Sequence, residues 1–222
     1  MSPSTGLQLF GHPFSSYTQK ALIALYADGT EFEYRKLDVE NPEPFFAELR
    51  RYWPFGKFPV IVDDGKAIAE ATVVIEHLQV HHPGPNEWIP EGETGRRVRF
   101  LDRFFDLYVM NNMQKISTDP LRPDGCRDDH GVEVARADLN TAYDWLEEQM
   151  PQDGWFAGDF SLVECAAAPS LFYADWVEPI GDKRPKLGAY RARLLAHPAV
   201  SRCVEEGRPY RNYFPRGAPD RD

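Results

Sequence analysis

Residues 59–81 read PVIVDDGKAIAEATVVIEHLQVH, and the fold is decided in this stretch. Two short apolar runs, 59–62 and 66–69, flank Asp64-Gly65, a pair that readily adopts the positive backbone angles of a tight turn. The pattern predicts a β-hairpin. The segment from Ala71 to His81 follows the hairpin directly and predicts a helix.

The segments before this hairpin alternate between strand-like and helix-like patterns. They predict a strand at Leu7–Phe10, a helix at Ser15–Asp28 that Gly29 ends, a strand at Phe32–Val39 and a helix at Pro44–Tyr52. The order is therefore β-α-β-α-β-β-α. Such an order predicts an α/β domain with helices covering a sheet, which we assign to residues 1–83.

The sequence pattern changes after this domain. Proline and glycine interrupt every periodicity in HPGPNEWIPEGETG, residues 82–95, so we expect a linker at 84–95. Apolar residues then recur at helical spacing, and Ser161-Leu-Val-Glu164 matches a capping box that starts a helix. We expect residues 96–222 to form an all-helical domain, with helices near 162–177, 186–196 and 199–206.

Composition limits the possible functions. The net charge of −10 argues against nucleic acid as a partner, because phosphate binding needs a basic face. The sequence holds no apolar run long enough to cross a bilayer, and MSPSTGLQLF does not have the pattern of a secretory signal. Three scattered cysteines fit a reducing compartment, so we expect a cytoplasmic protein without membrane association.

Several segments in order resemble the glutathione transferase family, and together they span nearly the whole chain. PFSSYTQKALIAL (13–25) is similar to the SSxSxxxRIAL segment of serine-type members of the family. The resemblance is to theta- and zeta-like members of the bacterial style. WPFGKFPV (53–60) is similar to NPxGKVPxL, and AEATVVIEHL (69–78) to xESxAIxxYL. FAGDFSLVE (156–164) is similar to LxGDxxSxAD, and LLAHPAV (194–200) to the RPAV ending.

The resemblance implies a thioredoxin-like N-terminal domain followed by a helical one, and a homodimer. It also implies an enzyme that binds glutathione as co-substrate and joins it to, or isomerises, a small hydrophobic electrophile, with no metal cofactor. Two other functions stay open, namely a non-catalytic binding or scaffold protein of the same fold and a lyase or isomerase specialised for one metabolite.

Ser15 is the candidate catalytic residue. It stands where the first strand's loop meets the first helix, so its hydroxyl could donate a hydrogen bond to the glutathione sulfur. Spacing alone favours a simple helix cap; the resemblance favours the functional hydroxyl, with Ser16 second and Tyr17 third. Because serine and not cysteine occupies this position, disulfide reduction at this site is excluded.

The remaining candidates would hold the two ends of glutathione. The resemblance implies that Lys57 holds the glycyl carboxylate and that a cis Phe58–Pro59 bond presents the Phe58 backbone to the cysteinyl part. The exposed amides at the start of the helix suit the γ-glutamyl carboxylate, and Glu70 suits the ammonium group. Simpler structural roles for these residues are a surface lysine, an edge-strand proline and a helix-end acid.

Some positions depart from the family's pattern. Ala71 replaces the usual serine and removes a hydroxyl that would hold the carboxylate, a loss for which Thr72 could partly compensate. Trp53 replaces an asparagine, and this pattern gives no reason for it.

The other candidates are weaker. Tyr108 is a candidate contact for the electrophile, His77 is expected only to pack, and the pair His81-His82 is expected to be solvated. Cys126 and His130 are too few ligands for zinc.

Overall fold

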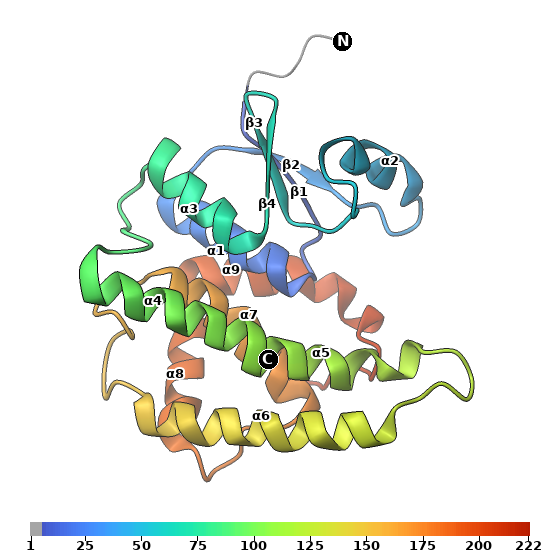
Figure 1. The fold of residues 1–222 in the computed structure, drawn as a ribbon, viewed down its shortest axis with the longest axis vertical. Helices are drawn as coiled ribbons and strands as arrows, with labels where there is room; N and C mark the ends of the chain where they lie inside the picture. The colour runs from blue at the N-terminus through green and yellow to red at the C-terminus, as the bar shows by residue number, and fades with distance from the viewer. Residues whose placement is uncertain (1–5) are drawn as a thin grey trace.

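The computed structural model of the chain describes residues 6–222. Residues 1–5 lie outside the described residues. They are the first half of MSPSTGLQLF, in which we expect no secretory signal. A small sheet with its helices lies on one side of the molecule, and a larger group of helices lies on the other (Figure 1).

The N-terminal half forms a four-stranded mixed sheet in the order β2-β1-β3-β4. Strand β1 is parallel to β2 and antiparallel to β3, and the expected hairpin joins β3 to β4. The elements are β1 (Gln8–Gly11), α1 (Ser16–Asp28), β2 (Glu33–Lys36), α2 (Glu43–Tyr52), β3 (Val60–Asp63), β4 (Lys66–Ala69) and α3 (Ala71–His81). The predicted βαβαββα order of a thioredoxin-like domain is confirmed.

One strand is shorter than the sequence predicts. The pattern indicates a strand over Phe32–Val39, but β2 covers Glu33–Lys36. Because β2 is an edge strand, it can pair only along β1, which is itself four residues long. The strand-like pattern of residues 32–39 is therefore longer than the stretch of β1 with which it can pair.

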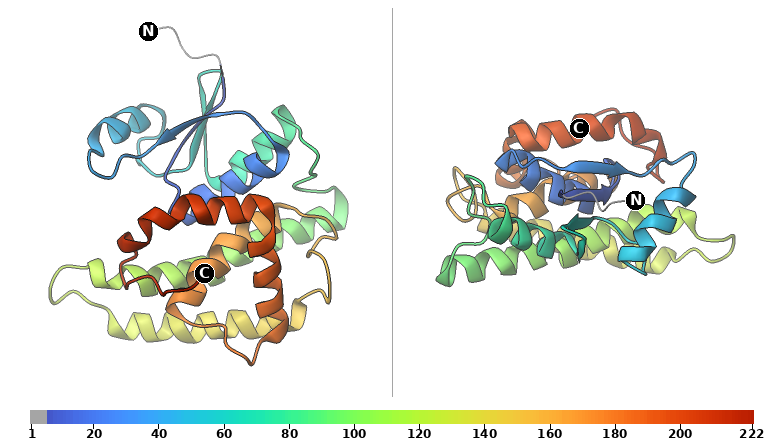
Figure 2. Two further views of the ribbon diagram at one scale, coloured as in Figure 1. Left: turned by 180° about the vertical axis from the view of Figure 1, so that it is seen from behind. Right: turned by 90° about the horizontal axis from the view of Figure 1, so that it is seen from above.

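Helices cover both faces of the sheet because successive strand residues point to opposite sides. Leu9 and Ile61 face the main core, which includes α1, α3 and the helical half. Phe10 and Val60 face a smaller core that α2 covers. Figures 1 and 2 show α1 and α3 between the sheet and the helices of the C-terminal half, so these two helices form the contact between the halves.

The C-terminal half is helical, as expected. Its elements are α4 (Gly92–Phe104), the π-helical turn η1 (Phe105–Met110), α5 (Asn111–Thr118), the 3-10 turn η2 (Asp119–Leu121), α6 (Asp129–Gln149), α7 (Leu162–Val177), α8 (Pro185–Ala196), α9 (Pro198–Gly207) and η3 (Arg208–Tyr213), a 3-10 segment. The predicted capping box of Ser161 and Glu164 is confirmed at the start of α7. Helix α4 begins inside the segment predicted as a linker, and the bounds of the three segments, 1–83, 84–95 and 96–222, stay predictions.

No helix within residues 6–222 combines the length and apolar character that a membrane crossing requires.

Candidate active site

A cavity of about 330 Å³ lies where the sheet half meets the helical half. Five of the six residues predicted to bind glutathione line it, and they come from two separate segments of the sheet half. The full lining is Tyr17, Trp53, Lys57, Phe58, Pro59, Glu70, Ala71, Arg103, Asp106, Leu107, Asn111 and Gln114. The tertiary structure therefore brings together the segments around positions 57 and 70, which only the resemblance had connected.

A larger groove lies elsewhere, along β2 and α9, with a volume of about 1010 Å³. It is open to solvent and holds none of the six predicted site residues. The smaller cavity is the candidate site because the groups with the expected chemistry line it.

Lys57, Phe58 and Pro59 enter the cavity from the loop before β3. The Phe58–Pro59 peptide bond is cis, as the resemblance implied. Lys57 is exposed, whereas Pro59 is buried against the sheet. The segment therefore offers a cation and a fixed backbone on the same wall of the cavity.

Glu70 and Ala71 form the corner between β4 and α3. Glu70 has φ of 71°, a backbone conformation that a non-glycine residue rarely adopts. Such strain costs about 1–3 kcal/mol and concentrates at functional positions. The Glu70 side chain caps no amide of α3, so the first amides of the helix keep no side-chain partner from this residue.

Thr72 does not compensate for the hydroxyl missing at Ala71. Its Oγ1 accepts a hydrogen bond from Lys20 Nζ at 3.0 Å and donates one to Asp102 Oδ2 at 2.9 Å. Thr72 does not line the cavity. The expectation of compensation was wrong because the buried charges behind α3 already engage this hydroxyl.

Ser15 is the predicted site residue that does not line the cavity. It caps α1, and its Oγ accepts a hydrogen bond from the Thr18 amide at 3.3 Å. Capping uses an oxygen lone pair, and within residues 6–222 the hydroxyl hydrogen has no protein acceptor. The two roles considered for Ser15 are therefore compatible, and its role toward sulfur stays a prediction.

The two neighbouring alternatives differ in access to the cavity. Ser16 is buried and does not line it, whereas Tyr17 is half-buried and does. Burial, together with the nearby carboxylates of Asp106 and Glu70, raises the pKa of Tyr17 to about 12. The phenol is therefore protonated at neutral pH and can act there only as a neutral hydrogen-bonding group.

The helical half contributes residues that the sequence interpretation did not identify. Arg103, Asp106, Leu107, Asn111 and Gln114 line the cavity. They follow one another across the π-helical turn η1, which shifts the helical register by about one residue. No periodic signal marks such a turn in the sequence.

Tyr108, the predicted electrophile contact, lies outside the cavity lining. It is 54% exposed and stacks on Phe104 with ring centroids 5.1 Å apart. Its neighbour Leu107 lines the cavity instead. Trp53, for which the sequence offered no reason, is part of the cavity wall and packs against Phe55.

The expectations for two histidines need correction. His77 does more than pack, and His82 is not merely solvated, because the Nε2 atom of each lies 2.8 Å from Asp63 Oδ2. His82 directly follows the last residue of α3 and is its C-cap. The hairpin brings Asp63 to this point, and the sequence order alone does not show that approach.

Two family models match the chain. The glutathione S-transferase N-terminal domain matches residues 9–86, and the glutathione S-transferase C-terminal domain matches residues 96–193. The chain belongs to the glutathione transferase family. The predicted membership, fold class and enzyme class are thereby confirmed.

Individual relatives agree over nearly their full length. A probable maleylacetoacetate isomerase of Vibrio cholerae is 26% identical, covering 91% of this chain and 97% of that protein. Glutathione S-transferase F6 of Arabidopsis thaliana is 24% identical, covering 90% and 99%. The sequence similarity therefore includes both domains.

Solved structures agree in fold. A glutathione S-transferase from Methylobacillus flagellatus with glutathione bound has a TM-score of 0.78 at 20% identity, covering 89% of this chain and 98% of that one. The glutathione transferase URE2P8 of Phanerochaete chrysosporium, with oxidized glutathione, has a TM-score of 0.80 at 16% identity, covering 95% and 98%.

Proposed function

We propose that this glutathione transferase binds glutathione in the cavity between its halves and activates the thiol with Ser15 for conjugation to, or isomerisation of, a small hydrophobic electrophile. One observation carries the proposal: Lys57, Phe58, Glu70 and Ala71 meet in one cavity beside the start of α3. Relatives named as transferases and as an isomerase support both outcomes of the same activated thiol.

The energetics of thiol activation are within reach of one hydroxyl. A free thiol has a pKa near roughly 8.5, and lowering it by about two units takes roughly 2.7 kcal/mol. A hydrogen bond to a charged group supplies about 1.5–3 kcal/mol. The N-terminus of α1, which Ser15 caps, adds about 0.3–1 kcal/mol.

The charged ends of glutathione would be held by two separate segments that line the cavity. Lys57 pairs with the glycyl carboxylate, and Glu70 pairs with the γ-glutamyl ammonium. The uncapped amides at the start of α3, beside Ala71, donate hydrogen bonds to the γ-glutamyl carboxylate. Loss of the usual hydroxyl at Ala71 weakens this corner by about 1 kcal/mol.

The electrophile would lie against the helical half. Leu107 supplies an apolar contact from this half, and Trp53 supplies one from the sheet half. Asn111 and Gln114 supply amide groups that can hydrogen-bond a carbonyl. This mixed wall favours an electrophile that carries both an apolar part and a polar oxygen.

The decisive test is the pKa of the bound thiol, measured by the ultraviolet absorbance of the thiolate during a pH titration. Ser15→Ala should raise this pKa by about 1–2 units, since one charged hydrogen bond is lost. Ser16→Ala is the matched control, because Ser16 is buried whereas Ser15 is half-buried, and it should leave the pKa unchanged. An equal pKa in wild type and Ser15→Ala would remove Ser15 from its role.

A non-catalytic glutathione-transferase-fold binding or scaffold protein is the second candidate. Ala71 favours it, because Thr72 is already engaged and does not replace the missing hydroxyl. Calorimetry distinguishes the two functions: no heat of binding at millimolar glutathione would establish the second. Tight binding without turnover of general electrophiles would instead indicate an enzyme restricted to one metabolite.

The proposal extends to a cytoplasmic homodimer. Helices α3 and α4 expose Val73, Val80 and Phe100 at 46%, 69% and 48%, which supports an apolar contact between two copies. Light scattering during size-exclusion chromatography should give twice the mass of the chain. A monomer at micromolar concentration would contradict this part of the proposal.

A further inference from the structure

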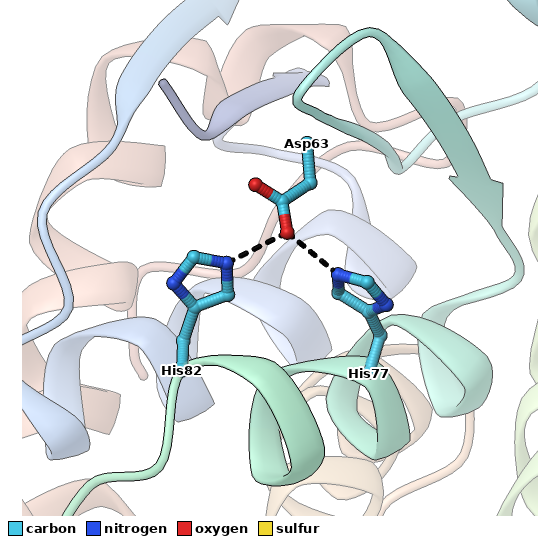
Figure 3. A group of neighbouring side chains, drawn as sticks. All are labelled: Asp63, His77 and His82. Carbon is cyan, nitrogen blue, oxygen red and sulfur yellow. Dashed lines mark hydrogen bonds and ion pairs between the residues drawn. The ribbon is translucent and has the colours of Figure 1, made fainter. Parts of the chain in front are cut away.

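Asp63, His77 and His82 place three potential metal ligands at one point on the surface of the sheet half (Figure 3). Asp63 ends β3, His77 lies in the second half of α3, and His82 directly follows that helix. One ligand atom from each residue lies within 4.8 Å of the other two. The three side chains therefore converge although they come from two different elements.

From this geometry we infer a divalent metal site in which Asp63 Oδ2 and the Nε2 atoms of His77 and His82 are the ligands. Two imidazoles with one carboxylate form a nitrogen and oxygen set that suits Zn²⁺ and its analogue Co²⁺. A tetrahedral ion would leave its fourth position to water.

The two distances from the histidine nitrogens to the carboxylate oxygen are close to those the ion requires. Each Nε2 lies 2.8 Å from Asp63 Oδ2. Ligand atoms around a tetrahedral zinc lie on the order of 3.3 Å apart, because each is about 2.0–2.1 Å from the metal. Each nitrogen would therefore move from the oxygen by about half an ångström, which rotation about side-chain bonds allows.

The arrangement also leaves a path for the ion. The side chains of Asp63, His77 and His82 are 16%, 19% and 30% exposed, so they are held by their surroundings but reachable from solvent. When the ion is absent, hydrogen bonds from the imidazoles hold the carboxylate in place.

The site is separate from the proposed glutathione site. Glu70 lies at the start of α3, and His77 lies seven residues later, about 10 Å along the helix axis. The ion would tie the end of β3 to the end of α3, the helix whose start forms the γ-glutamyl corner. Its effect is therefore on the stability of the sheet half, and the inference does not depend on the proposed function.

The test uses the untagged full chain, stripped with a chelator and titrated with Co²⁺ at pH 7.5. We expect one ion per chain, with the visible absorption bands of tetrahedral cobalt. Zn²⁺ should displace the cobalt, and saturating Zn²⁺ should raise Tm by about 5 °C or more.

Variants decide whether these three residues are the ligands. Because His82 lies outside the helix, the His82→Gln variant should fold normally and bind Co²⁺ at least about 10-fold more weakly than wild type. The His77→Gln variant should weaken Co²⁺ binding by a similar factor. His81→Gln is the matched control: His81 is exposed and its ring packs on His77 at 4.3 Å, but it is not one of the three ligands. His81→Gln should keep wild-type affinity.

Three results would overturn the inference. The first is the absence of cobalt bands in the wild type, and the second is equal affinity in wild type and His82→Gln. The third is a stoichiometry of one ion per two chains, which would indicate a site between copies.

Discussion

Lys20 in α1 and Asp102 in α4 form a buried ion pair across the contact between the two halves. Lys20 Nζ lies 2.6 Å from Asp102 Oδ1, and the side chains are 2% and 1% exposed. Nζ also lies 3.1 Å from Asp106 Oδ2. Asp106 lines the candidate cavity, so this cluster connects the contact between the halves to that cavity.

Lys20→Met should destabilise the protein by about 3–5 kcal/mol, because it leaves two carboxylates without their cation in a buried place. Urea unfolding measures the loss. Burial already raises the pKa of Asp106, and Lys20 only partly opposes this, so removing Lys20 should raise that pKa further. Arg103→Met is the control and should cost less than about 1 kcal/mol, because Arg103 is 61% exposed. Equal losses in both variants would contradict the role of burial.

Ala71→Ser should tighten glutathione binding by about fivefold, since it restores one hydrogen bond worth about 1 kcal/mol at the start of α3. Isothermal calorimetry provides the dissociation constant. Ala67→Ser is the matched control, because Ala67 is exposed on β4 and does not line the cavity. If Ala71→Ser binds no more tightly than wild type, the γ-glutamyl corner lies elsewhere.

Glu70→Gln should weaken glutathione binding by about tenfold, because a neutral amide cannot pair with the ammonium group. Glu76→Gln removes one charge from the exposed side of the same helix and serves as the control. Calorimetry at low and at high salt compares the two variants. An equal effect of both substitutions would indicate general electrostatics and no specific contact.

His12 should make stability depend on pH. Burial, with a smaller contribution from the Lys36 charge, lowers the pKa of His12 to about 4. Its Nδ1 accepts a hydrogen bond from the Phe14 amide, which protonation would break. The unfolded chain takes up this proton near pH 6.5, so the stabilisation is present above pH 6.5 and is lost as the pH falls toward 4.

Each unit of pKa shift corresponds to about 1.4 kcal/mol, so lowering the pKa from 6.5 to about 4 predicts a loss of about 3 kcal/mol. Urea unfolding at several pH values measures it. His12→Gln should remove this contribution while leaving the acid response of the carboxylates. Parallel stability curves for wild type and His12→Gln would contradict the assignment.

Glu164 should be a major stabilising residue of the helical half. Its buried carboxylate accepts hydrogen bonds from the Phe156 and Ser161 amides, the Ser161 hydroxyl and the Tyr190 hydroxyl. Glu164→Ala should cost about 3 kcal/mol or more, because several buried donors lose their acceptor. Tyr190→Phe removes one of these bonds and should cost about 1 kcal/mol. A loss below that of Tyr190→Phe would show that water replaces the carboxylate.

Several elements could be predicted because their signals are short in sequence. Asp64-Gly65 specifies the hairpin turn, and Ser161 with Glu164 specifies the start of α7. The resemblance added Lys57, Phe58 and Glu70, which do line one cavity. The π-helical turn η1 could not be predicted, because helical periodicity continues on both sides of it. For this reason the sequence pattern favours Tyr108 as the electrophile contact, whereas Leu107 lines the cavity.

The amino-acid sequence by itself determined the order of strands and helices and the residue types available to a thiol site, because caps, turns and apolar periodicity act between residues near one another in the chain. Only the tertiary structure decided that Lys20 meets Asp102, that Thr72 is engaged behind α3 and that Asp63 lies between two histidines. These approaches depend on how whole helices pack on a sheet. Packing sums many weak contacts between distant segments, and no local pattern records that sum.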